Sequence, residues 1–187
     1  LKPYPLVVGL TTVALFAMHG NIYLLLKTEG ALQARVRRWV PKTITAFMVM
    51  YAVTSTFTVL HLPHMTRNLF AHPLLFTIPL LNVLAVLNIP REISKDRVGR
   101  AFLSSCAAMI LLLLLFGVGL FPNLVYSTPV ASHSLHIYNA ASSPRTLKIM
   151  AIIAALGVPV VLAYQIWAYK LFSVKVTDAD LAHEEMY

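Results

Sequence analysis

Residues 101–120 read AFLSSCAAMILLLLLFGVGL and contain no charged side chain. A membrane-spanning helix needs about 20 predominantly apolar residues. This stretch has that length, and its centre is an unbroken run of leucines from Leu111 to Leu115. It therefore predicts a helix that crosses a membrane, and the remaining chain can be searched for others of the same kind.

Four further stretches share this character, which gives five predicted spans. They lie at 6–26, 44–62, 73–89, 101–120 and 147–172. The third is the shortest and is interrupted by Pro79, and the fifth contains Pro159; neighbouring helices can satisfy the carbonyl that such a proline leaves free. We expect a kink at each. The sequence thus predicts an all-α fold, a polytopic membrane helical bundle over 1–172 followed by a cytoplasmic tail at 173–187.

The overall composition agrees with a membrane protein. Of the 187 residues, 58% are hydrophobic and 12% are charged, whereas soluble domains carry about 25% charged residues. Disorder needs low hydrophobicity and high net charge, so it is excluded. The net charge of +8 does not indicate a nucleic-acid partner, because the basic residues lie between apolar runs and not on a soluble face. The single cysteine, Cys106, excludes an internal disulfide.

The distribution of Lys and Arg predicts the orientation. Eleven of the 15 basic residues lie in three segments on one side, at 27–42, 91–100 and 170–175. Cytoplasmic loops carry the excess of Lys and Arg, so we expect the C-terminus in the cytoplasm and the N-terminus outside, in a multi-pass protein of a bacterial or archaeal cell membrane.

This orientation raises a question about the start of the chain. A sequence that begins outside with Leu1, and without a signal peptide, has no visible means of translocating its first residues. We therefore expect the C-terminal part of a longer protein, or one piece of a split one. The alternative is a short N-terminal tail that crosses unaided.

The acidic residues are all placed outside the predicted spans. They are Glu29, Glu92, Asp96, Asp178, Asp180, Glu184 and Glu185. Proton relays and cation sites in membranes usually depend on buried Asp or Glu. This pattern argues against a self-contained proton pump or cation-coupled transporter.

One histidine, His19, lies well inside a span. It could be a haem ligand, a polar contact to a quinone, or a packing histidine that is hydrogen-bonded across a close contact permitted by Gly20. We favour packing, because haem would usually need a second axial ligand, and we expect this chain to bind no haem iron. The other histidines considered are interpreted as interfacial residues and not as metal ligands: His61, His64, His72, His133 and His136.

Other polar residues inside the spans are interpreted as interhelical hydrogen-bonding groups. They are Thr54, Ser55, Thr56, Thr58, Asn82, Ser104, Ser105 and Gln165. No phosphate-binding loop, nucleophile elbow or zinc motif is present, so no catalytic, cofactor-binding or metal-binding residue is assigned. In the connection 122–146, Asn139 and the 142–144 turn are expected to form an ordered cap at the outer end, with Ser143–Pro144 starting the last helix.

Several stretches resemble subunit II of the cytochrome bd quinol oxidases. The start of the chain, Leu1–Tyr4 with Gly9, and HGNIYLLLKTEGALQARVRR at 19–38 resemble the opening of that subunit's second half. The pair Phe121–Pro122 and SLHIYNAASSPRTLKIM at 134–150 resemble its loop before the last helix, and PVVLAYQIWAYKLF at 159–172 resembles that helix. The similarity extends in order over nearly the whole chain, although the middle spans match mainly in pattern.

The resemblance implies a non-haem subunit of a terminal oxidase that oxidises quinol and reduces oxygen to water. Haems b558, b595 and d, and the quinol-oxidising loop, would belong to the partner, subunit I. Further expected partners are the first-half segment of subunit II or its split counterpart, membrane lipid, and a structural quinone, which some members hold.

The sequence also departs from the family. The first-half signature with its tryptophan, aspartate, glycine and asparagine is absent, as are the carboxylates of its proton path, and His136 stands where Thr is more common. No catalytic residue is therefore carried over. An alternative function is half of a repeat-built transporter, in which Pro79 with Asn82 and Pro159 with Gln165 would form a site at broken helices.

Small residues on the first and fourth spans predict where a neighbouring chain packs. The first span offers Ala14, Ala17, Gly20 and Asn21, and the fourth offers Ser104, Ala107 and Ala108. Lipid solvates apolar surface as well as protein does, so close packing of small residues must drive assembly. We predict that Gly20→Leu releases the subunit from a haem-containing complex on gel filtration in mild detergent. An intact, fully active complex would contradict this.

Overall fold

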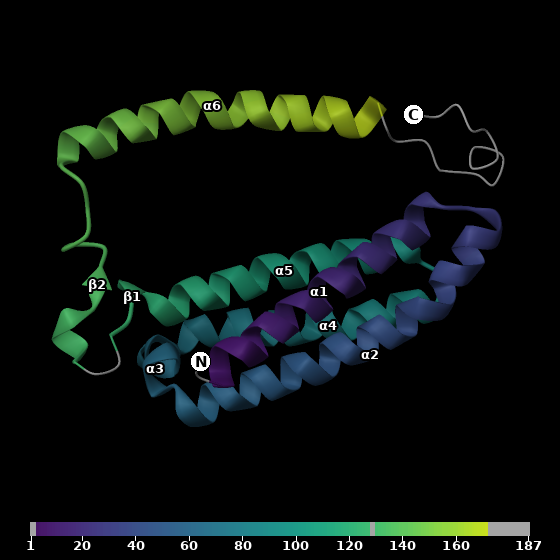
Figure 1. Cartoon of the computed structure of the whole chain (residues 1–187), viewed down its shortest axis with the longest axis horizontal. Helices are drawn as coiled ribbons and strands as arrows, with labels where there is room; N and C mark the ends of the chain where they lie inside the picture. Colours follow the sequence, from purple (N-terminus) through teal and green to yellow (C-terminus); the bar gives the residue numbers. More distant parts are fainter. Residues whose placement is uncertain (1–2, 128–129, 172–187) are drawn as a thin grey trace. The chain divides into compact units, whose positions relative to one another are not determined.

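The computed structural model describes residues 3–127 and 130–171 (Figure 1). The α-helices are α1 (Pro3–Lys27), α2 (Gly30–His61), α3 (Pro63–Ala71), α4 (Thr77–Ser94), α5 (Val98–Leu120) and α6 (Pro144–Leu171). Two 3-10 turns, η1 (Pro73–Phe76) and η2 (Ala131–His133), and two short strands, β1 (Asn123–Val125) and β2 (Leu135–His136), complete the elements. Within the described residues, five helical segments are long and apolar enough to cross a membrane: α1, α2, η1 with α4, α5 and α6. The predicted all-α fold with five spans is confirmed.

The chain divides into two compact units, one up to residue 121 and one from residue 122. In the first unit α1 pairs with α2, α4 pairs with α5, and α1 also contacts α5, so that two helical hairpins form one bundle (Figure 1). The hairpin of α1 and α2 turns over two residues, and Gly30 adopts φ 68° there. That left-handed conformation favours glycine.

The α4–α5 hairpin is held by one face of each helix. The buried residues of α4 are Asn82, Val86, Ile89 and Glu92, at the three- and four-residue spacing of a single helical face. Small side chains on α5, including Ala101, Ser105 and Ala108, are buried as well. Small residues let helix backbones approach closely, and α4 and α5 pack against each other along these faces.

The second helix begins much earlier than its predicted apolar span. It starts at Gly30 and not at residue 44, and Val36 and Val40 are buried while Arg35 and Arg38 are exposed. This first part is amphipathic and therefore lacks the continuous apolar run that marks a span. The sequence analysis also missed α3, a short helix in the connection between the second and third spans.

One of the two prolines expected inside a helix lies at a helix start instead. Pro79 lies in the first turn of α4, where a backbone N–H would have no intrahelical acceptor, so no hydrogen bond is lost that would require a kink. Pro90 lies inside the same helix, just beyond the predicted end of the third span. Pro159 lies inside α6, as predicted, and a kink there stays a prediction.

The expectation that every acidic residue lies in a loop or the tail is wrong for Glu92. It lies in the last turn of α4, is only 5% exposed, and its Oε2 atom has no hydrogen-bond partner among the described residues. The helix continues past the predicted end of the apolar run, which carries this carboxyl into the bundle. The other acids tested by the structure, Glu29 and Asp96, lie between helices, and those after residue 173 lie outside the described residues.

The expected close contact at Gly20 is also absent within the described chain. A methyl group added there would meet no atom within 4 Å, so this face of α1 is open to a neighbour. The close approach occurs instead at Gly119, where an added Cβ would lie 3.0 Å from the backbone oxygen of Met65. Glycine there allows α3 to pack against the end of α5.

Hydrogen bonds join the described residues at the start of the second unit. Strands β1 and β2 pair antiparallel, with Asn123 opposite His136. The side chain of Asn139 accepts a hydrogen bond from the His136 N–H at 2.7 Å and donates to the Ser134 carbonyl at 3.1 Å. The Ser143 hydroxyl accepts from the Thr146 N–H at 3.3 Å directly before α6, which confirms the predicted start of that helix.

Candidate functional site

A partly buried hydrogen bond joins α1 to α5 within the bundle. The Nδ1 atom of His19 lies 2.8 Å from the Ser105 Oγ, and the His19 ring stacks on Phe102 with 4.9 Å between ring centroids. Ser105 has one hydroxyl proton, which it donates to the Phe102 carbonyl at 2.7 Å. We therefore assign the donor role to the His19 Nδ1–H. This is the packing histidine that the sequence analysis favoured.

Amide side chains join α4 to α5. Asn82 is fully buried and donates to the Ala108 carbonyl at 2.8 Å, while its own amide oxygen has no partner among the described residues. Asn88 donates to the Ser104 hydroxyl at 2.9 Å. The interhelical role predicted for Asn82, Ser104 and Ser105 is thereby confirmed.

Hydroxyl groups form a continuous seam between α1 and α2. The Thr11 hydroxyl donates to the Val7 carbonyl at 2.8 Å, so the Thr54 hydroxyl, 2.5 Å from it, is the donor in their contact. In the same way Thr58 donates to the Thr54 carbonyl at 2.8 Å, and the Tyr4 hydroxyl, 3.0 Å away, donates to Thr58. The protons of these hydroxyls are all engaged, and lone pairs on their oxygens remain to accept hydrogen bonds.

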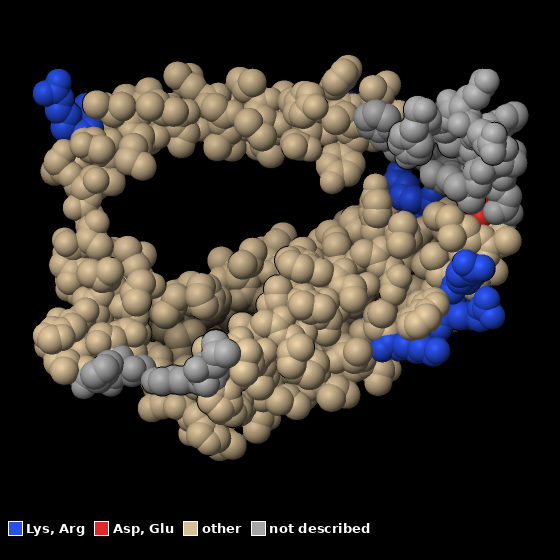
Figure 2. Space-filling view, in the orientation of Figure 1, with Lys and Arg blue, Asp and Glu red and all other residues tan. Residues whose placement is uncertain are grey.

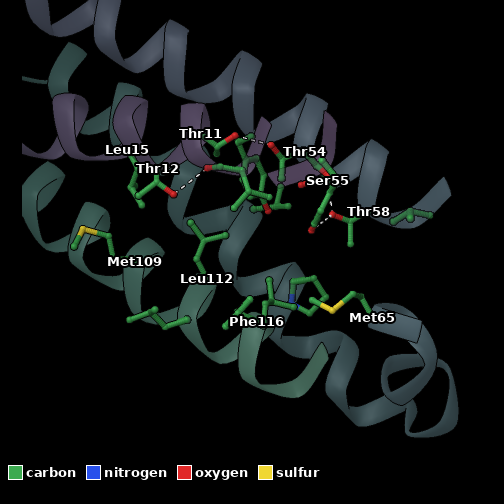
Figure 3. A pocket seen from close by; sticks show the side chains of 18 of the residues that line it. Thr11, Thr12, Leu15, Thr54, Ser55, Thr58, Met65, Met109, Leu112 and Phe116 are labelled. Carbon is green, nitrogen blue, oxygen red and sulfur yellow. Dashed lines mark hydrogen bonds between the residues drawn. The ribbon is translucent and has the colours of Figure 1, made fainter. Parts of the chain in front are cut away.

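The seam forms one wall of a pocket between α1, α2, α3, α4 and α5 (Figure 3). The cavity has a volume of about 570 Å³, within the range of small-molecule sites. Its other walls are apolar and include Leu15, Met65, Met109, Leu112 and Phe116, several of which point toward the hydroxyl-bearing residues in the close-up (Figure 3). Such a site suits a long, mainly apolar molecule with one polar end that donates hydrogen bonds.

Sequence reasoning named only part of this site. It identified Thr54, Ser55 and Thr58 as polar residues inside a span, and all three line the pocket. It gave no role to Tyr4 or Thr11, because a single hydroxyl near the start of an apolar run carries no signal by itself. Tyr4 and Thr11 are seven positions apart, which is about two helical turns and places both on one helix face. This spacing is the signal in the sequence that could have identified them.

The remaining predicted candidates are dispersed. His61 ends α2, His64 lies in α3, and His72 lies between α3 and η1, while His133 and His136 belong to the second unit. Burial lowers the pKa of His64, which favours its neutral form. Among the described residues, no three or more His, Cys, Asp or Glu side chains converge as metal ligands would.

The contacts of His19 involve one ring nitrogen and one ring face. Its Nδ1 lies against Ser105 and its ring stacks on Phe102, so Nε2 is the nitrogen that a metal could still reach. Met18, beside it in sequence, is fully buried on a different face of α1. These contacts give His19 a packing role, and the expectation that this chain binds no haem iron stays a prediction.

Comparison with known proteins distinguishes the two functions left open, a subunit of a terminal oxidase and half of a repeat-built transporter. The family model described as cytochrome bd terminal oxidase subunit II matches residues 1–172. The chain belongs to this family. Members of it are membrane subunits of terminal quinol oxidases, so the repeat-built transporter is not favoured.

Several relatives support the assignment. Cytochrome bd-I ubiquinol oxidase subunit 2 of Escherichia coli (strain K12) is 24% identical over 97% of this chain and 55% of its own length. Cytochrome bd ubiquinol oxidase subunit 2 of Bacillus subtilis (strain 168) is 29% identical over 96% of this chain and 52% of its length. A probable cytochrome oxidase subunit 2 of Haemophilus influenzae is 29% identical over 92% and 52%. The chain spans about half the length of these curated relatives.

Proposed function

We propose that this chain is a membrane subunit of a quinol:oxygen oxidoreductase complex and that it supports a haem-bearing subunit I. The observation that carries the proposal is the family match over nearly all of a bundle whose buried polar groups serve to hold helices together. Haems b558, b595 and d would be held by the partner, in a multi-pass complex of the cell membrane. A first-half segment of subunit II, in the same or another chain, would complete this subunit.

The open surface of α1 supports a scaffolding role. A Cβ atom added at Gly20 would have no neighbour within 4 Å. Large apolar residues on the same helix, such as Leu10 and Phe16, are about 60% exposed. An apolar surface in a bilayer does not by itself require a protein partner. Exposed apolar residues together with the small Gly20 give a surface that another helix could approach closely.

The proposal predicts that haem co-purifies with this chain while His19 is dispensable for the spectrum. A tag on this chain should retrieve a coloured complex with haem b and haem d absorption. His19→Gln should leave these bands unchanged, because the contacts of the ring with Ser105 and Phe102 give it a packing role between α1 and α5. A colourless preparation would overturn the oxidase assignment. Loss of a haem b band from an assembled His19→Gln complex would overturn the claim about this histidine.

We also propose that the pocket lined by the five helices α1 to α5 holds the structural quinone. Its apolar walls would take the isoprenoid tail, and the oxygens of Tyr4, Thr54 and Thr58 would lie against the ring. Because the protons of these hydroxyls are engaged within the protein, the wall accepts hydrogen bonds. It would therefore favour the reduced form of the ring, whose hydroxyls donate.

Filling the pocket should expel the quinone. Leu112 lines the cavity, whereas Leu114 on the same helix does not and is 50% exposed. We predict that Leu112→Trp lowers the quinone-to-haem ratio of the purified complex by more than half, measured by solvent extraction and chromatography, while the haem spectrum is retained. Leu114→Trp is the matched control and should keep the ratio of the unmodified protein. Equal ratios in both variants would refute a quinone at this position.

A further inference from the structure

One end of the bundle is strongly basic. It consists of the turns that join α1 to α2 and α4 to α5 together with the adjacent helix ends, and we call these residues, 27–42 and 91–100, the basic end. Figure 2 shows Lys and Arg side chains gathered there. The two segments contain nine basic residues and three acidic ones. An ion pair connects them, because the Arg37 guanidinium lies 2.6 Å from the Asp96 carboxylate. Asp96 adopts φ 55° in its turn, a conformation that Asp tolerates better than most residues.

The acidic residues of the basic end leave most of this charge uncompensated. Asp96 is occupied by Arg37, and Glu92 is buried inside the bundle. Exposed Arg and Lys side chains therefore outnumber the available carboxylates. Such an excess of Lys and Arg sets orientation, and clusters of four or more cations beside a membrane span also attract anionic headgroups.

Three of these cations form a stripe on the first part of α2. Arg35, Arg38 and Lys42 are separated by three and four residues, which places them on one helix face. The opposite face carries Val36 and Val40, which are buried in the bundle. The packing of those valines fixes the rotation of the helix, so the stripe faces outward, and none of its members forms an ion pair with another described residue.

The position of the stripe along α2 matches the headgroup layer of a bilayer. Lys42 lies next to the apolar part of the helix, and Arg35 lies about 10 Å further along the axis at 1.5 Å per residue. The headgroup region on each side of the hydrocarbon is about 5–8 Å thick, so Lys42 and Arg38, which is about 6 Å further along, lie within it, and Arg35 lies at its outer edge. Trp39, between them, is 55% exposed, and the Lys42 Nζ lies 4.9 Å from its ring centroid. Tryptophan is enriched at this level of membranes.

We propose that the stripe of Arg35, Arg38 and Lys42 is a binding site for the phosphate headgroup of an anionic phospholipid. Arginine binds phosphate through paired N–H groups and lysine as a compact point charge. Trp39 lies against the glycerol level of the same lipid. The site is independent of the quinone pocket, which is lined by the opposite halves of α1 and α2.

The test compares two double variants that each remove one Arg and one Lys from the purified, full membrane complex. Arg38→Gln/Lys42→Gln removes two members of the stripe, and Arg145→Gln/Lys148→Gln removes a matched pair at the start of α6. Binding of phosphatidylglycerol and of phosphatidylcholine with identical chains is measured by native mass spectrometry during lipid titration. A cation near an anionic surface contributes roughly fivefold to affinity.

We expect Arg38→Gln/Lys42→Gln to weaken the tightest phosphatidylglycerol binding roughly 10- to 30-fold and to leave phosphatidylcholine binding unchanged. The α6 pair should change neither, and Arg38→Lys/Lys42→Arg should retain binding because it preserves the charge. Equal weakening for both lipids, equal weakening by both pairs, or unchanged binding would overturn the proposal. Dissociation of the complex by the stripe variant alone would show a protein partner at this surface and would overturn it as well.

Discussion

The amide, hydroxyl and imidazole donors that lie between the helices of this bundle must find their acceptors within the protein, because hydrocarbon offers none. That constraint fixes how the helices pair. His19 reaches Ser105 across α1 and α5, Asn82 reaches a carbonyl of α5, and Thr54 reaches Thr11 across α1 and α2. Apolar contact alone cannot select a register, since lipid competes equally well for leucine surface. The polar contacts, together with small residues on α5, therefore specify which turns of the helices meet.

The sequence supported prediction of the spans because each is a long apolar run, and this signal does not depend on neighbours. It also supported the interhelical role of Asn82 and Ser105, since a polar side chain inside a span must pair. It could not supply the pairs themselves. His19 and Ser105 are 86 residues apart, and only the arrangement of α1 against α5 brings them together. The pocket is hidden for the same reason, because its walls come from five helices.

Two of the incorrect expectations, those for Glu92 and for the start of α2, share a physical cause. Glu92 and the first part of α2 lie where the chain leaves the hydrocarbon, and there an amphipathic helix can continue without an apolar run. A hydropathy criterion ends the span too early and assigns the next residues to a loop. At this end of the bundle a buried carboxyl, an ion pair between Arg37 and Asp96, and an outward basic stripe coexist within a few turns. The opposite half contains the hydroxyl-lined pocket, so the two halves offer different chemistry to ligands.

The claim that buried polar contacts hold the helices in register is tested most directly by a double-mutant cycle on His19 and Ser105. Unfolding free energies in mild detergent would be measured for the unmodified protein, His19→Leu, Ser105→Ala and the double variant. A hydrogen bond between the two side chains predicts a coupling energy of about 0.5–1.5 kcal/mol. Additive effects, with a coupling energy near zero, would contradict the account.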